Sequence, residues 1–445
     1  PSAADARLAA DAAAAALPAW AALGPTERRG LLLRAADALE ARNADFVDAM
    51  AGETGATAGW AGFNVRLAAG ILREAAAMTT QVGGEVIPSD KPGCLAMSVR
   101  KPAGVCLGIA PWNAPVILGV RAVAMPLACG NTVVLKASEL CPRTHQLIGA
   151  ALQEAGLPAG VLNVVTNAPA DAAEVVAALI AHPAVRRVNF TGSTRVGRLI
   201  AQQCACLFKP VLLELGGKAP FLVLDDADLG EAVKAAAFGA FMNQGQICMS
   251  TERIVVDEAV ADAFVQQLAD KAAALPAGDP RGPVVLGSVI SHEAADHVMA
   301  LIDDALAKGA VLRSAPERQG TILKATVLDH VTPAMRIYAE ESFGPVVTVV
   351  RVRGDEQAVR VANDTEYGLS AAVFSRDIAR ALRVAERIES GICHINGATV
   401  HDEAQMPFGG VKDSGWGRFG GRAAIAEFTD LRWITVETRP GHFPF

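Results

Sequence analysis

The chain has 445 residues, of which 51% are hydrophobic and 20% are charged, and its formal net charge at pH 7 is −7. This length exceeds what one hydrophobic core usually holds, so we expect about two or three domains. The apolar content excludes an intrinsically disordered protein. The acidic balance excludes nucleic acid as the expected partner, and the absence of an apolar run of about 18 residues predicts no membrane span.

The N-terminal region has helical patterns from Asp5 to Thr80. Its alanine-rich start lacks a basic segment followed by an apolar one, so we expect a helix there and not a signal peptide. Pro25 opens a long amphipathic run, and Gly83-Gly84 ends the helical region. Residues 85–87 and 95–100 then have strand character, and a turn rich in Pro and Gly joins them.

Beyond Pro102, short apolar runs alternate with helical patterns. We expect strands at 105–109, 132–135, 161–165 and 185–190, with helices at 116–128, 144–155 and 171–181. A second series follows, with strands at 221–224 and 253–256, helices from Leu229 and at 259–274, and further elements to about Ile395. This alternation predicts an α/β fold with mostly parallel sheets between helices. The strand-like tail, 428–436, is expected to join the 85–100 hairpin.

One cysteine, Cys248, stands at a junction between an alanine-rich helical run and a strand. Gly245 can adopt backbone angles that a β-carbon forbids, so the chain can turn sharply before the thiol. Such a position suits a nucleophile, although a free cysteine is often only a small buried hydrophobe. The eight cysteines have no disulfide-framework spacing, which indicates a reduced, cytoplasmic protein.

The sequence contains one candidate phosphate-binding turn and no convincing metal site. Gly192-Ser193 follows a predicted strand and opens a helix, so its amides and hydroxyl can either hold a phosphate or only cap the helix. Arg198-Leu199 stands where a P-loop has Lys followed by Ser or Thr, which excludes that motif. The histidines and cysteines lack zinc-site spacing, so we predict no metal.

Several short motifs occur in a fixed order along nearly the whole chain. They are Pro111-Trp112-Asn113, Leu135-Lys136-Ala137-Ser138-Glu139, Phe190-Thr191-Gly192-Ser193-Thr194, Leu213-Glu214-Leu215-Gly216-Gly217-Lys218, Gly245-Gln246-Ile247-Cys248, Glu341-Ser342-Phe343-Gly344-Pro345 and Pro407-Phe408-Gly409-Gly410. Together they resemble the NAD(P)-dependent aldehyde dehydrogenase superfamily. Residues 249–253 and 394–400 are similar to its salicylaldehyde and vanillin dehydrogenase branch.

The resemblance implies three catalytic residues. Cys248 is the nucleophile, because a thiolate forms an adduct with an aldehyde and later leaves from a thioester. The side-chain amide of Asn113 and the Cys248 backbone N–H hold the oxyanion. Glu214 is the general base, and burial at the end of a strand is expected to raise its pKa toward neutrality. Members that transfer acyl groups to coenzyme A generally lack this glutamate, so its presence favours release of a free acid.

The resemblance also implies NAD as the cofactor. Lys136 and Glu139 hold the adenosine ribose hydroxyls, where a carboxylate repels a 2′-phosphate and favours NAD over NADP. Ser193 contacts the pyrophosphate, Glu341 anchors the nicotinamide ribose, and Phe343 packs beside the nicotinamide ring. The full predicted set is Ile109, Pro111, Trp112, Lys136, Ser138, Glu139, Gly192, Ser193, Leu215, Gly216, Glu341 and Phe343.

The substrate site is less specified, with Arg121, Trp60, Trp416, Met249 and Ile247 as candidates. Arg121 lies two helical turns after Asn113, so both can face one cleft. It either binds a substrate hydroxyl or a product carboxylate, or forms a salt bridge between helices. The two tryptophans could line a slot for a flat ring, and core packing is the alternative for Trp60.

These inferences predict an enzyme of two interleaved Rossmann-like domains. Residues 1–83 and 103–216 form the NAD-binding domain, 217–424 the catalytic domain, and 84–102 with 425–445 a β element that pairs subunits into a homodimer or homotetramer. The expected reaction is oxidation of an aromatic aldehyde of the salicylaldehyde, vanillin or benzaldehyde type. Its alternatives are an aliphatic or semialdehyde substrate, an NAD-independent cysteine hydrolase or acyltransferase, and a non-catalytic scaffold.

Overall fold

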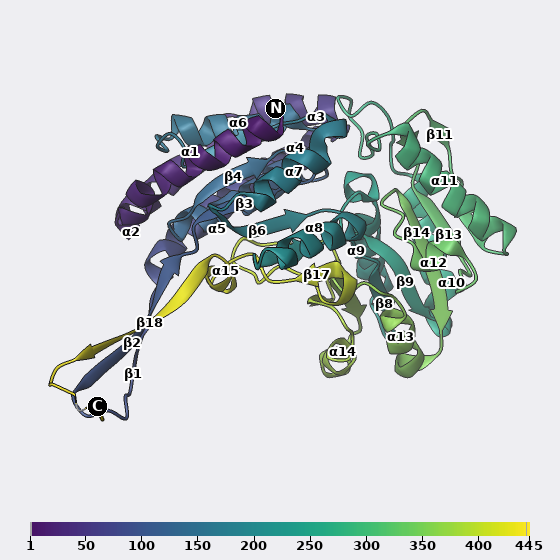
Figure 1. The fold of residues 1–445 in the computed structure, drawn as a ribbon. Coiled ribbons are helices and arrows are strands. Elements are labelled where there is room, and N and C mark those ends of the chain that lie inside the picture. Colours follow the sequence, from purple (N-terminus) through teal and green to yellow (C-terminus); the bar gives the residue numbers. More distant parts are fainter. Residues whose placement is uncertain (1, 442) are drawn as a thin grey trace.

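Two mainly parallel sheets and one small antiparallel sheet organise the chain, as seen in a computed structural model that describes residues 2–441 and 443–445 (Figure 1). This arrangement confirms the predicted α/β class. None of the helices in these ranges is both long and apolar enough to cross a membrane.

The N-terminal region is helical, as predicted. Its helices are α1 (Ala3–Ala22), α2 (Pro25–Ala41), α3 (Asn43–Thr54) and α4 (Ala58–Met78). The Ser2 hydroxyl caps α1 by accepting the Asp5 N–H, Pro25 occupies the first position of α2, and Gly55 ends α3 in a left-handed conformation with φ 68°.

The first sheet has the strand order β17-β7-β6-β3-β4-β5. Its strands are β3 (Val105–Ile109), β4 (Thr132–Lys136), β5 (Leu162–Val165), β6 (Val185–Thr191), β7 (Val211–Glu214) and β17 (Gly415–Trp416). Its helices are α5 (Pro115–Ala128), α6 (Pro142–Glu154), α7 (Ala172–Ala181) and α8 (Thr194–Cys206). The predicted strands and helices of this region are confirmed, with small differences at their ends.

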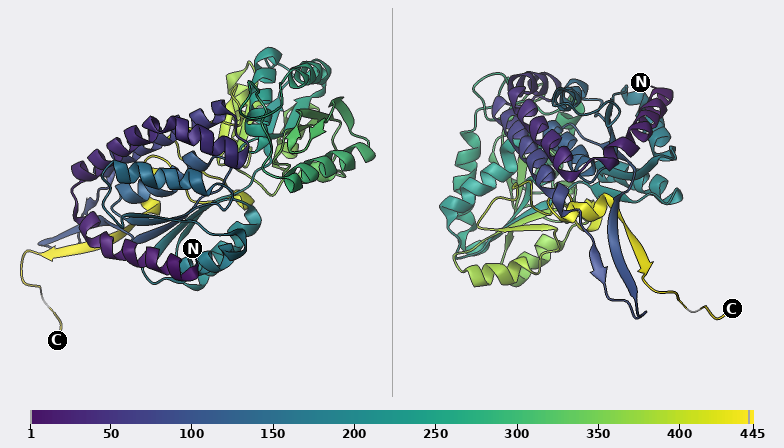
Figure 2. Two further views of the ribbon diagram at one scale, coloured as in Figure 1. Left: turned by 90° about the horizontal axis from the view of Figure 1, so that it is seen from above. Right: turned by 90° about the vertical axis from the view of Figure 1, so that its left-hand side faces the viewer.

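Alternating side chains bury both faces of this sheet. Val105 and Leu107 of β3 pack in a cluster with α1, α7 and α8, whereas Cys106 between them packs in a cluster with α2, α4, α5 and α6. The view from above shows the sheet between these two layers of helices (Figure 2, left).

The second sheet has the order β10-β13-β14-β9-β8-β15-β16. Its strands are β8 (Ala219–Val223), β9 (Thr251–Asp257), β10 (Val311–Ser314), β13 (Thr326–Asp329), β14 (Val346–Val352), β15 (Ser370–Phe374) and β16 (Ile392–Ile395), and a short pair β11 (Arg318–Gln319) and β12 (Ile322–Leu323) lies apart from it. Its helices are α9 (Leu229–Phe241), α10 (Glu258–Ala273), α11 (His292–Ala307), α12 (Arg336–Ala339), α13 (Gly354–Asn363) and α14 (Ile378–Ala385). Only the edge strand β10 pairs antiparallel among these strands.

The small sheet joins β1 (Glu85–Ile87), β2 (Cys94–Pro102) and β18 (Thr429–Glu437), with β2 in the centre. The register of β18 and β2 runs from Thr429 opposite Pro102 to Glu437 opposite Cys94. The helix α15 (Ala423–Glu427) precedes β18. This sheet extends away from the body of the molecule (Figure 1, lower left) and confirms the predicted pairing of the tail with the hairpin.

The chain returns to the first sheet after it has completed the second. Residues 415–416 lie within the segment predicted as the catalytic domain, 217–424, but they pair antiparallel with β7, Gly415 opposite Glu214. At this crossing the Ser414 hydroxyl donates to the Gly216 carbonyl at 2.6 Å. The predicted domain boundary therefore does not follow the sheets at this point.

Candidate active site

The loop that carries Cys248 connects α9 to β9 and is tightly constrained. Asn243, Gln244 and Gly245 all have left-handed backbone angles, with φ of 49°, 56° and 71°. A β-carbon on Gly245 would lie 2.1 Å from the Gly344 carbonyl oxygen, so this position requires glycine, as the sequence predicted. The Gln244 side chain also donates to the Ser288 carbonyl at 2.9 Å. The loop therefore holds the thiol in a fixed place.

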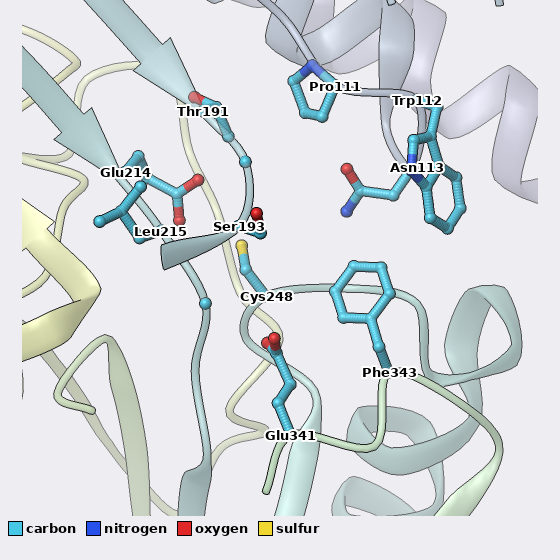
Figure 3. A pocket seen from close by; sticks show the side chains of 12 residues that line it. Pro111, Trp112, Asn113, Thr191, Ser193, Glu214, Leu215, Cys248, Glu341 and Phe343 are labelled. Atoms are coloured by element: carbon cyan, nitrogen blue, oxygen red, sulfur yellow. The ribbon is translucent and has the colours of Figure 1, made fainter. Parts of the chain in front are cut away.

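Cys248 and Asn113 lie at the junction of two cavities. The first cavity has a volume of about 230 Å³ and the second about 290 Å³. Besides Cys248 and Asn113, the first is lined by Pro111, Trp112, Thr191, Gly192, Ser193, Glu214, Leu215, Gly216, Glu341 and Phe343. Figure 3 shows Glu214, Cys248 and Glu341 extending into this shared space from different segments. The structure thus brings the three predicted catalytic residues together with eight of the predicted cofactor residues.

Asn113 is held from two sides. Its side-chain Nδ2 donates to the Gln246 carbonyl at 3.0 Å. Its own main-chain carbonyl accepts one hydrogen bond from the Trp60 indole and one from the Asn243 side chain, both at 3.0 Å. Because an amide nitrogen carries two hydrogens, Nδ2 retains one donor for an oxyanion beside Cys248.

Glu214 ends β7, and its side chain has neither carboxylate oxygen in a hydrogen bond within the described residues. Burial raises the pKa of Glu214 to about 7, an effect that the Cys248 thiol and Arg121 oppose and that Asp402 increases. Near neutral pH this carboxyl group therefore both accepts and releases a proton, which is what a general base requires.

The surroundings of Cys248 disfavour its thiolate form. Burial raises its pKa well above the ordinary value, the carboxylates of Glu214 and Glu341 raise it further, and Arg121 opposes them. A thiol with a raised pKa needs a base to form the thiolate, and Glu214 lies in the same cavity.

Glu341 lies opposite two glycines. Its Oε1 accepts the Gly217 N–H at 2.9 Å, and burial raises its pKa to about 8. A β-carbon on Gly216 would lie 2.8 Å from Glu341 Oε2, and one on Gly217 would lie 2.3 Å from the Cys248 carbonyl oxygen. Side chains at either position would close the space beside the thiol.

A buried ion pair fixes the segment that carries Glu341 and Phe343. Glu252 accepts hydrogen bonds from the Ser342 amide and hydroxyl and from the Phe343 amide, at 2.8–3.2 Å. The Lys218 ammonium balances its charge at 2.7 Å and also donates to the Glu340 carbonyl. Phe343 in turn meets Trp112 edge to face, with ring centroids 5.7 Å apart.

The remaining predicted cofactor residues, Ile109, Lys136, Ser138 and Glu139, do not line the first cavity. Ile109 and Lys136 end the paired strands β3 and β4, opposite each other, at the same carboxyl edge where β7 ends in Glu214. Ser138 follows in the next loop, where its amide donates to His145 Nδ1 at 3.1 Å.

The Lys136 ammonium pairs with the Glu139 carboxylate, which also accepts from Asn167 at 3.1 Å. Burial opposes ionisation of Glu139, but the hydrogen bonds from Lys136 and from the backbone outweigh it and hold its pKa below the ordinary value.

This edge and the first cavity fit a nicotinamide dinucleotide. Ser193 caps the N-terminus of α8 and lines the cavity, so the capping and phosphate-binding interpretations of this turn are compatible. The ionised Glu139 at a strand end suits ribose hydroxyls, and the two glycines leave room for a flat ring beside Cys248. Thr191 also lines the cavity and was missed, although it stands within the motif that contains Gly192 and Ser193.

The second cavity has mainly apolar walls. Its lining includes Trp60, Phe63, Leu67, Ile117, Leu118, Phe238, Met242, Ile247, Met249, Val400 and Phe408, with Arg66, Arg121, His401 and Asp402 as charged or titratable members. Of the predicted substrate residues, Trp60, Arg121, Ile247 and Met249 are present here. Trp60 stacks on Phe63, with ring centroids 5.5 Å apart.

Trp416, which was also predicted for the substrate site, lies elsewhere. Its side chain is on β17, 54% exposed, and its indole donates to the Val211 carbonyl at 2.8 Å. It lines neither cavity, because its strand pairs at the far side of β7 from this wall. Phe408 and Asp402, from the same C-terminal region, provide the wall that we expected from Trp416.

Arg121 forms the salt bridge that was its alternative role, although the partner is a loop residue and not a helix. Its Nη2 lies 2.5 Å from Asp402 Oδ2, and its guanidinium lies over the Phe408 ring, 4.5 Å from the centroid. Asp402 and Phe408 are almost 300 positions from Arg121, so local sequence patterns gave no sign of their contact with it.

Comparison with known proteins assigns nearly the full length of this chain to one family. Residues 1–434 match the model of the aldehyde dehydrogenase family. A vanillin dehydrogenase of Pseudomonas fluorescens is 66% identical over 99% of this chain and 91% of its own length. The crystal structure of a salicylaldehyde dehydrogenase from Pseudomonas putida G7, complexed with salicylaldehyde, superposes with a TM-score of 0.98 at 52% identity and covers 100% of this chain and 92% of that one.

A third similar structure is that of PnpE in complex with nicotinamide adenine dinucleotide. It has a TM-score of 0.95 and 37% identity, and the match covers 100% of this chain and 92% of that one. The ordered motifs, the two sheets and the cysteine at the junction of two cavities all agree with these matches. The chain belongs to the aldehyde dehydrogenase family, whose members oxidise aldehydes with NAD(P).

Proposed function

We propose that this protein oxidises aromatic aldehydes to carboxylic acids and that it uses NAD as the cofactor. The observation that carries this proposal is the position of Cys248 between the two cavities. The second cavity presents Trp60, Phe63 and Phe408 to a substrate that reaches the thiol, and flat apolar rings pack well against such side chains. The similar vanillin and salicylaldehyde dehydrogenases act on compounds of this class.

The cycle begins with proton transfer from the Cys248 thiol to Glu214. The thiolate sulfur then bonds to the aldehyde carbon, and the resulting oxyanion accepts hydrogen bonds from Asn113 Nδ2 and the Cys248 amide. A bound nicotinamide supplies the hydride acceptor, and Glu341, Phe343 and Ser193 are the residues that would hold the cofactor near the thiol. Glu214 then releases to solvent the proton it took from Cys248, accepts a proton from the water that attacks the thioester carbon, and returns this proton to the departing Cys248 thiolate as the acid leaves.

The preference for NAD over NADP rests on Glu139. Its carboxylate is ionised at neutral pH and is already paired with Lys136, so a 2′-phosphate at this position would meet negative charge without a free cation. Ribose hydroxyls, in contrast, donate hydrogen bonds that this carboxylate accepts.

We also propose that the first sheet and its helices bind the cofactor, that the second sheet carries the nucleophile, and that the small sheet pairs subunits. Val86, Leu431 and Trp433 on the small sheet are 61–76% exposed, which supports burial by another copy in a homodimer or homotetramer. All eight cysteines are free thiols, the state that the reducing cytoplasm maintains.

The test is NADH production from salicylaldehyde, vanillin, benzaldehyde, acetaldehyde and betaine aldehyde, with NAD and with NADP. We expect the aromatic members with NAD to have the highest kcat/KM and the Cys248→Ser variant to produce no NADH. Higher turnover of acetaldehyde or betaine aldehyde would contradict the aromatic assignment, and higher turnover with NADP would contradict the role of Glu139. Hydrolysis of thioesters without any NADH from the panel would instead support a cofactor-independent hydrolase.

A further inference from the structure

The buried carboxylate of Asp402 forms part of the wall of the second cavity. Its side chain is only 8% exposed and that of Arg121 only 6%. Asp402 Oδ2 accepts a hydrogen bond from Arg121, whereas Oδ1 is buried without a hydrogen-bond partner in the described part of the chain. A buried acceptor left unpaired destabilises a protein, so a ligand that donates a hydrogen bond to Oδ1 gains affinity.

The chemistry of a carboxylate restricts which ligand group fits. An ionised carboxylate only accepts hydrogen bonds, and an aldehyde oxygen also only accepts, so the reacting group cannot satisfy Oδ1. A ring hydroxyl donates, whereas a methoxy oxygen does not. We propose that Asp402 makes this enzyme selective for hydroxylated aromatic aldehydes, because its Oδ1 accepts a hydrogen bond from the ring hydroxyl. This inference rests on the proposed function and adds a substrate class to it.

Arg121 has a positioning role in this arrangement. Its charge is balanced by Asp402, so it is not free to hold a product carboxylate, the other role that the sequence allowed for it. Its contact with the Phe408 ring fixes the plane of the guanidinium and thereby the Asp402 carboxylate. The other charged or titratable members of this wall, Arg66 and His401, are exposed, so within the described ranges Asp402 and Arg121 are the buried charges that line the second cavity.

The test compares matched substrates with NAD: benzaldehyde, the three hydroxybenzaldehydes and the three methoxybenzaldehydes. In the unmodified enzyme, kcat/KM for at least one hydroxy isomer is expected to exceed that for its methyl ether and for benzaldehyde by about tenfold or more. In Asp402→Asn we expect the amide oxygen to accept from Arg121, which leaves an NH₂ donor in place of the Oδ1 acceptor, so the ratio should fall toward one. Glu403→Gln removes a neighbouring carboxylate that contacts His401 and Gln405, and this variant should retain the original ratio.

Equal turnover of hydroxy and methoxy substrates would overturn the inference, and so would an unchanged ratio in Asp402→Asn. Absence of NADH from every substrate, benzaldehyde included, would overturn the proposed function instead. A second measurement needs no variant: phenol and anisole are tested as competitive inhibitors of benzaldehyde oxidation. Phenol is expected to inhibit at a concentration about tenfold lower, and equal inhibition would contradict a hydrogen bond to Asp402.

Discussion

The indole N–H of Trp60 donates a 3.0 Å hydrogen bond to the main-chain carbonyl of Asn113. One residue therefore both lines the second cavity and positions the amide that would hold the oxyanion. We therefore expect substrate contact and oxyanion stabilisation to be coupled through this hydrogen bond.

The Trp60→Phe substitution tests this coupling. Phenylalanine keeps an aromatic wall but cannot donate, so the Asn113 carbonyl loses one of its two donors, and we expect kcat to fall by about fivefold to tenfold for benzaldehyde and acetaldehyde alike. Steady-state kinetics with both substrates measure the effect. Phe63→Leu, which removes the stacking partner but no hydrogen bond, should affect only the aromatic substrate. A loss confined to benzaldehyde in Trp60→Phe would show that the indole acts only as a wall.

Glu214 should govern the pH dependence of turnover. Because its pKa lies at about 7, the fraction of active base increases as pH rises through that value, and kcat/KM should rise with it. Glu214→Gln removes the base and should lower kcat by about 10²-fold to 10⁴-fold, with no ascending limb near pH 7. A pH–rate profile from pH 5.5 to 9 measures both effects. A limb that persists in the variant would assign the titration to another group.

The same residue should limit the stability of the fold. The pKa of Glu214 is raised from 4.5 to about 7, so the folded chain binds the extra proton between these values, and stability falls as pH rises through them. The Glu214→Gln variant has no carboxyl group at this position, so it does not lose stability in this way as pH rises. From pH 4 to pH 8 its stability relative to the unmodified enzyme should therefore increase, by up to about 3 kcal/mol.

Thermal unfolding at several pH values tests this second role of Glu214. Glu154→Gln, which changes an exposed carboxylate on α6, is the matched control and should show no such trend. A variant whose Tm difference stays constant with pH would contradict the raised pKa.

Glu139→Gln should weaken the discrimination between the two dinucleotides. Removing the negative charge leaves the Lys136 ammonium available to a 2′-phosphate, so the ratio of kcat/KM with NAD to that with NADP should fall by about tenfold or more. The ratio is measured at a saturating aldehyde concentration. An unchanged ratio would place the basis of cofactor preference elsewhere.

Much of the fold could be predicted because its signals are local. Short apolar runs between helical patterns predicted the strands β3 to β6 of the first sheet, and the immediate neighbours of Gly245 predicted its sharp turn. The motifs supplied the residues of the first cavity, which come from segments with distinctive sequences.

The second cavity could not be predicted in the same way. Its wall combines helices α4 and α5 with a loop near residues 400–408, and which side chains of that loop face inward depends on long-range packing. Asp402 carries no local pattern that distinguishes it from the exposed acids nearby. Trp416 was predicted for the substrate site because it is a tryptophan between two glycines. The pairing of β17 with β7 places it outside the cavity.

The pairing of residues 415–416 with β7 also affects the order in which the enzyme can mature during synthesis. The strand that bears Glu214 gains its outer neighbour, and the Gly216 carbonyl gains its Ser414 donor, only after residues 414–416 have been made. The proposed nucleophile and its proposed base therefore belong to segments that are translated long before these contacts can form. A nascent chain that ends before Ser414 should contain Cys248, Asn113 and Glu214 and still be inactive, because the contacts made by residues 414–416 are missing.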